Sequence, residues 1–145
     1  MIMATKIRHQ QVFGNFRPPL RERAKPKLSA QQRREGNCEE HRRLIKMLPC
    51  CVTGKAAPND GHHLKSGPAK GERALGRRAT DRWLVPLCRQ AHDELERISS
   101  RLELSWFRER GIDDPVELAA ALWANTGDLE RMTRIVQAHM GRPPR

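Results

Sequence analysis

The chain has 145 residues, of which 37% are hydrophobic and 4% aromatic, so we expect one core of modest size. Its formal net charge of +11 predicts a polyanionic partner, most commonly a nucleic acid. No segment approaches the roughly 20 apolar residues that span a bilayer, and the first residues lack the apolar centre of a signal peptide. We therefore expect a soluble, cytoplasmic protein without a membrane partner. Four cysteines, two of them adjacent, make a poor disulfide framework.

The N-terminal segment, residues 1–35, is strongly basic. Residues 1–34 contain nine Lys and Arg residues against a single acid, Glu22, and three prolines interrupt the segment. This composition predicts a flexible arm that neutralises DNA phosphates. A solvated tail without a specific role is the alternative.

A helix is expected directly after the arm. Asn37 and Glu40 have the spacing of a capping box, and Pro49 marks the end of the helical pattern. Apolar residues recur between them at helical spacing, which predicts one buried face. This face consists of Leu44, Ile45 and Leu48.

Two short strands are expected next. Between residues 50 and 87 the helical period disappears, and glycines and prolines interrupt the chain. Short apolar runs near residues 62–64 and 83–87 predict strands on either side of a long polar loop.

Helical patterns resume at Arg89 and again over residues 102–110. Asp113 or Asp114 caps a fourth helix, and a last amphipathic helix runs over residues 129–140. The order of these elements predicts an α+β fold, with a two-stranded hairpin flanked by several helices.

The histidines occupy chemically informative places in this order. His62 and His63 lie on the first predicted strand, and His92 lies in the first turn of the helix after the second strand. A metal-dependent nuclease needs a base, a divalent cation beside the scissile phosphate, and a rigid frame for both. Two histidines on a strand and one on the following helix can supply these groups.

These histidines belong to a longer pattern. Its segments are Pro49-Cys50, His62-His63, Thr80-Asp81, Val85-Pro86-Leu87-Cys88 and His92.

Together the segments resemble the HNH (ββα-metal) endonucleases, in the phage and prophage branch that includes RecA-dependent recombination-associated nucleases. The resemblance runs from about residue 48 to residue 127. It implies a nuclease domain over residues 36–126, a small ββα-metal core, and a C-terminal helix with a short tail over residues 127–145. It also implies hydrolysis of DNA phosphodiester bonds in phage recombination or processing. A RecA-type recombinase filament would be a second partner, and the host cytoplasm the location if a phage encodes the chain.

The resemblance places His63 as the general base and His62 and His92 as metal-holding residues of the catalytic set. The expected cation is Mg²⁺ or Mn²⁺, and a histidine-rich site also accepts Ni²⁺ or Co²⁺. Neighbouring strand residues point to opposite faces, so His62 and His63 cannot both face the metal in an ideal strand. Which of these two is the base stays open here.

Related nucleases carry two cysteine pairs around a structural Zn²⁺. This chain has Thr53 and Ala91 where the second member of each pair would stand, so we expect packing to replace the zinc. Cys38 and His41 have C-x-x-H spacing, which we interpret as scattered helix residues. The remnants of the zinc site are Cys50, Cys51 and Cys88.

The remaining assignments concern charge. Asp81 is expected to accept backbone hydrogen bonds where the loop enters the second strand, and Glu94 and Glu96 to form a solvated helix face. Two other functions stay open: a non-catalytic DNA-binding recombination accessory module with a degenerate site, and an RNA-binding protein. The basic side chains expected to contact DNA phosphates near the site are Lys65, Lys70, Arg77, Arg78 and Arg82.

Overall fold

The computed structural model describes residues 35–73 and 77–141. The predicted basic arm therefore lies, but for residue 35, outside the described residues. Within them the chain is a mixed α+β fold with a two-stranded antiparallel sheet, as predicted. In the described ranges no helix is both long and apolar enough to cross a membrane. The elements are α1 (Glu39–Lys46), β1 (Asp60–His63), α2 (Pro68–Glu72), a 3-10 turn (Asp81–Trp83), β2 (Leu84–Leu87), α3 (Arg89–Glu96), a second 3-10 turn (Ser100–Leu102), α4 (Glu103–Glu109), α5 (Pro115–Ala124) and α6 (Leu129–His139).

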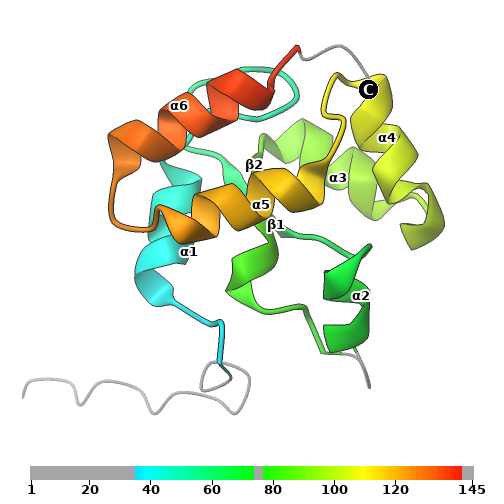
Figure 1. Cartoon of the computed structure of the whole chain (residues 1–145). Coiled ribbons are helices and arrows are strands. Elements are labelled where there is room, and N and C mark those ends of the chain that lie inside the picture. The colour runs from blue at the N-terminus through cyan, green and yellow to red at the C-terminus, as the bar shows by residue number, and fades with distance from the viewer. Residues whose placement is uncertain (1–34, 74–76, 142–145) are drawn as a thin grey trace, which may run out of the picture.

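The hairpin lies at the centre of the molecule. Its register pairs Asp60 with Leu87 and His63 with Leu84. All four residues of β2 are buried, because α1, α3 and α5 pack against the hairpin (Figure 1). Pro86 is tolerated in β2 because each strand of a two-stranded sheet has a free edge.

The core joins the hairpin to the helices. The apolar face predicted for the first helix is buried, as is the pair Trp106 and Phe107 of α4. α5 packs against β2 and also against α6 (Figure 1). The largest fully buried apolar side chains include Phe107, Ile45, Leu48, Leu64, Leu84, Leu87, Leu95, Ile112, Leu118, Leu122 and Met132.

The start of α1 differs from the predicted capping box. Cys38 is the N-cap, and its Sγ accepts a hydrogen bond from the backbone N–H of His41 at 3.5 Å. The Asn37 side chain instead accepts the backbone N–H of Asp81 at 3.2 Å. The Asn37 side chain therefore makes a tertiary hydrogen bond and does not cap α1.

The other helix ends follow their sequence signals. Asp114 caps α5, with Pro115 in the first turn, and Asp128 caps α6. Gly127 has a φ of 101°, which suits glycine in the turn between these two helices. The polar loop between the strands contains the short helix α2, which periodicity did not predict because five residues span little more than one turn.

Candidate functional site

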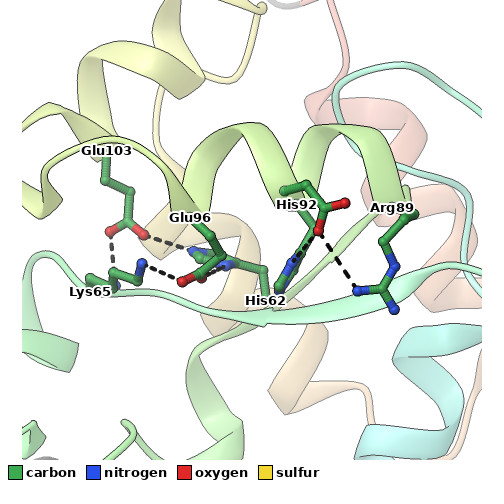
Figure 2. Close-up of polar contacts among 7 residues, drawn as sticks. His62, Lys65, Arg89, His92, Glu96 and Glu103 are labelled. Carbon is green, nitrogen blue, oxygen red and sulfur yellow. Dashed lines mark hydrogen bonds and ion pairs between the residues drawn. The ribbon is translucent and has the colours of Figure 1, made fainter.

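His62 is buried between the hairpin and the helices that follow it. Its side chain is 1% exposed, and its Nε2 lies 2.8 Å from Oε1 of Glu103 on α4. The ring meets that of His92 edge to face, with centroids 5.4 Å apart and planes at 77°. Figure 2 shows His92 and Glu96 on one helix and Glu103 on the next, all directed toward β1.

Glu103 is a buried carboxylate that orients His62. Its Oε2 accepts the backbone N–H of Lys65 at 2.8 Å. Burial raises the pKa of Glu103, but hydrogen bonds from His62, Ser66 and Lys65 outweigh burial and hold the pKa below its usual value. An ionised carboxylate only accepts, so the proton of this hydrogen bond sits on His62 Nε2 and Nδ1 presents its lone pair.

His62, His92 and Glu96 form a group that could hold a metal ion. Each offers one ligand atom, and these atoms all lie within 4.8 Å of one another. His62 Nδ1 is 3.4 Å from Glu96 Oε1. The Nδ1 atoms of both histidines are buried and make no hydrogen bond within residues 35–73 and 77–141. Two unsatisfied nitrogens beside a carboxylate oxygen are the environment that a cation would satisfy.

The electrostatics keep two of these groups in the form that binds metals. Burial lowers the pKa of His92, and the neighbouring His62 ring and Arg89 guanidinium lower it further against the opposing effect of Glu96 and Asp60, which favours the neutral ring. Burial raises the pKa of Glu96, but the hydrogen bond from Lys65, the charge of the Lys65 ammonium group and the neighbouring rings of His62 and His92 bring it below its usual value. Lys65 Nζ lies 2.9 Å from Glu96 Oε2. Neutral imidazole and ionised carboxylate are the ligating species.

His63 points to the opposite side of β1, as the strand alternation predicted. Its side chain is 20% exposed, and its Nε2 lies 3.0 Å from Oδ1 of Asp81. The candidate metal-binding group therefore contains His62 but not His63.

A basic cleft of about 450 Å³ adjoins both histidine environments. His63, His92 and Glu96 are all among its lining residues. Of the expected phosphate contacts, Lys65, Arg77 and Arg78 line this cleft, and Arg73 joins them.

Lys70 and Arg82 are not among the lining residues. Lys70 is exposed on α2. Arg82 packs against α5, with its guanidinium 5.9 Å from the centre of the Trp123 ring. The structure thus brings three of the five expected cations to the site.

The three cysteines expected as zinc remnants are buried in the core. Thr53 Oγ1 lies 3.7 Å from Cys88 Sγ, in hydrogen-bonding geometry. Burial raises the pKa of Cys50, but hydrogen bonds from the Thr53 side chain and from backbone N–H groups lower it below its usual value, whereas burial raises that of Cys51. The Cys38 and His41 pair contributes a helix cap and a buried ring, as the helix interpretation expects.

Sequence reasoning missed Glu103 and did not foresee the site contacts of Glu96 and Asp81. Asp81 was expected to accept backbone hydrogen bonds, and it accepts the N–H of Cys38, but its contact with His63 was not predicted. Glu96 was interpreted as a solvated position, and it is 45% exposed, but it also follows His92 by four residues and therefore shares its helix face. That spacing is a signal that could have found it. Glu103 and Asp81 meet their histidines only through the tertiary fold, at separations of 41 and 18 residues.

Comparison with known proteins places the chain in a family. Residues 17–109 match the family described as "Protein of unknown function (DUF968)", and this stretch is more than half of the 145 residues. The chain belongs to the DUF968 family. The stretch that matches DUF968 contains the candidate metal-binding group, Asp81 and Glu103, whereas α5 and α6 lie beyond it.

This DUF968 member is also similar to "Uncharacterized protein YdfU" of Escherichia coli (strain K12). The two are 35% identical over 85 residues, which cover 53% of this chain and 23% of YdfU. The chain thus spans less than a quarter of that relative's length. No solved structure matches the present chain.

Proposed function

We propose that the protein is a metal-dependent DNA endonuclease of the HNH type. The observation that carries the proposal is a group of three potential metal ligands, His62, His92 and Glu96, of which His92 and Glu96 line the same basic cleft as His63. Three protein ligands leave coordination positions open for water and substrate, which is typical of catalytic rather than structural metal sites.

Glu96 completes the ligand set that the sequence pattern left at two histidines. Two imidazoles and one carboxylate suit Mn²⁺, Co²⁺ or Ni²⁺ better than Mg²⁺, which prefers oxygen ligands. A divalent cation held there would neutralise charge on the scissile phosphate and on the leaving oxygen.

His63 is the base in this proposal, because His62 is buried and shares the metal group. The His63 ring takes a proton from a water molecule as the water oxygen attacks phosphorus. The P–O bond to the leaving oxygen breaks, and that oxygen takes up a proton from solvent. Lys65, Arg73, Arg77 and Arg78 supply positive charge where the DNA backbone would lie.

Nicking of supercoiled plasmid tests the proposal. Wild type, His63→Ala, Glu96→Gln and Glu94→Gln are compared in EDTA, Mg²⁺ and Mn²⁺, each with and without a RecA-type filament. Glu94→Gln is the matched control, since it removes the same charge from an exposed position of the same helix.

We expect Mn²⁺-dependent nicking by wild type and by Glu94→Gln. His63→Ala should lose at least about 100-fold in rate while it still binds Mn²⁺ by calorimetry. Glu96→Gln should lose both Mn²⁺ binding and nicking. Absence of cutting by wild type under every condition, with DNA bound in preference to matched RNA, would instead indicate a DNA-binding accessory module.

A further inference from the structure

A second buried carboxylate lies at the other histidine of β1. Asp81 is 2% exposed, and its Oδ1 is 3.0 Å from His63 Nε2. We infer that Asp81 holds His63 in the Nε2–H tautomer and leaves Nδ1 as the ring nitrogen that accepts a proton. This inference rests on the proposed function only for the role of His63 as base, because the position of the ring proton does not depend on cleavage.

The donors around Asp81 determine which partner carries the proton. Oδ2 accepts the backbone N–H of Cys38 at 2.9 Å and the Nη1 of Arg42 at 3.1 Å. Burial raises the pKa of Asp81, but these donors and His63 outweigh burial and hold the pKa below its usual value. An ionised carboxylate has no proton to give, so His63 Nε2 is the donor.

Asp81 is also fixed in position. Its own backbone N–H donates to Asn37 Oδ1 at 3.2 Å. On either side of it, Thr80 and Trp83 donate to the Glu72 carboxylate, at 2.7 Å from the Thr80 backbone nitrogen and 3.0 Å from the Trp83 indole nitrogen. The 3-10 turn that contains Asp81 is thereby anchored to α2 and to the start of α1. The Asp81 carboxylate therefore has a fixed position relative to the His63 ring.

The consequence concerns the chemistry of His63. A neutral imidazole has one nitrogen that donates and one that accepts, and the partner of the first decides the identity of the second. A carboxylate that orients a base which in turn activates a nucleophile is a recurrent arrangement in hydrolytic sites. Asp81 is therefore a positioning residue. If Asp81 only supported the fold, its replacement would leave the tautomer of His63 unchanged.

Asp81→Asn distinguishes these roles. Cys38 N–H and Arg42 both donate toward the Oδ2 position, so the amide oxygen of the asparagine must stay there. Its NH₂ group then faces His63 Nε2, which has to accept, and the ring proton moves to Nδ1. The variant keeps the shape of the side chain but reverses the tautomer. Asp128→Asn is the control, since it removes the same charge at the N-cap of α6, where asparagine also caps well and the side chain accepts from Arg131 rather than from His63.

Ring nitrogens are observed by long-range ¹H–¹⁵N correlation spectra of histidine-labelled protein without metal, at a pH where the rings are neutral. His63→Ala assigns the signals by their loss. We expect Nε2–H in wild type and Asp128→Asn, and Nδ1–H in Asp81→Asn. The Nδ1–H tautomer in wild type, or an unchanged tautomer in Asp81→Asn, would overturn the inference. The wild-type spectrum decides the matter even if Asp81→Asn does not fold.

Plasmid nicking separates this inference from the proposed function. A tautomer reversal together with a rate loss of at least about 100-fold, with Mn²⁺ binding retained, supports both. The expected spectra with no cutting by wild type would remove the nuclease but keep the Asp81 assignment. Wild-type cutting rates in a variant whose tautomer is reversed would refute Nδ1 as the proton acceptor.

Discussion

The imidazole of His62 and the carboxylate of Glu103 are both 1% exposed and lie 2.8 Å apart, although 41 residues separate them in the chain. A buried charge persists only where partners compensate it, and the donors to Glu103 include His62 Nε2 and the backbone N–H of Lys65. Carboxylates that orient metal-binding histidines in this way tune the affinity of the site.

Glu103→Gln should therefore weaken metal binding without touching a ligand. The Lys65 N–H requires an acceptor, so the amide oxygen stays with it and the NH₂ group turns to His62 Nε2. His62 Nδ1 then carries the ring proton and cannot ligate. We expect Mn²⁺ affinity by calorimetry to fall about 10- to 100-fold. Glu109→Gln, at an exposed position on the same helix, is the control, and equal affinities in the two variants would contradict this role for Glu103.

His41 should make stability depend on pH. Burial lowers its pKa to about 4, despite the charge of Asp81, which raises it. Its Nδ1 lies 2.8 Å from Thr126 Oγ1, whose own proton goes to the Trp123 carbonyl, so Nδ1 is the donor. The buried Nε2 has no hydrogen-bond partner among the described residues, and a proton there would be an uncompensated charge.

The sign follows from the lowered pKa. Above pH 6.5 the ring is neutral in both states, and between pH 6.5 and 4 the unfolded chain takes up a proton that the folded chain does not. The folded state should lose about 3 kcal/mol over this range. His41→Phe keeps an aromatic ring against Trp123 and cannot titrate. Urea unfolding of both proteins across this range should show the extra loss in wild type alone; parallel curves would exclude His41 as its source.

The cleft arginines should contribute to DNA affinity through phosphate contacts. Replacing Arg73 and Arg77 by alanine removes two cleft cations. The slope of log affinity against log salt should then decrease by about 2, with similar losses on unrelated DNA sequences. The matched control is Arg43→Ala with Arg134→Ala, on α1 and α6 away from this cleft. A control with the same loss would indicate that net charge, rather than the cleft, governs binding.

The buried cysteines Cys50, Cys51 and Cys88 should form a structural zinc site after two substitutions add further thiols. Thr53 Oγ1 hydrogen-bonds Cys88 Sγ, and Ala91 is buried one helical turn after Cys88. Thr53→Cys with Ala91→Cys would complete four thiolates. We expect about one additional equivalent of tightly bound Zn²⁺ in the purified, reduced double variant, measured by metal analysis, and none in either single variant. Zinc contents that do not differ would show that the side chains cannot converge.

Much of the fold is predictable from local sequence signals. The apolar face of α1, the caps at Asp114 and Asp128, and the helix that starts at Arg89 all follow from patterns within a few residues. Strand alternation also predicts that His62 and His63 face opposite sides, because it depends only on backbone geometry.

Only the tertiary structure decided which partner each histidine meets. Glu103 and Asp81 lie on turns and helices whose approach to β1 is determined by core packing, and no spacing rule relates residues 41 or 18 positions apart. Because of the same packing, Asn37 hydrogen-bonds Asp81 and does not cap α1, and Arg82 lies against Trp123 and not in the cleft. Side-chain hydrogen bonds and ring contacts of this kind depend on distances between elements, which local propensity does not encode.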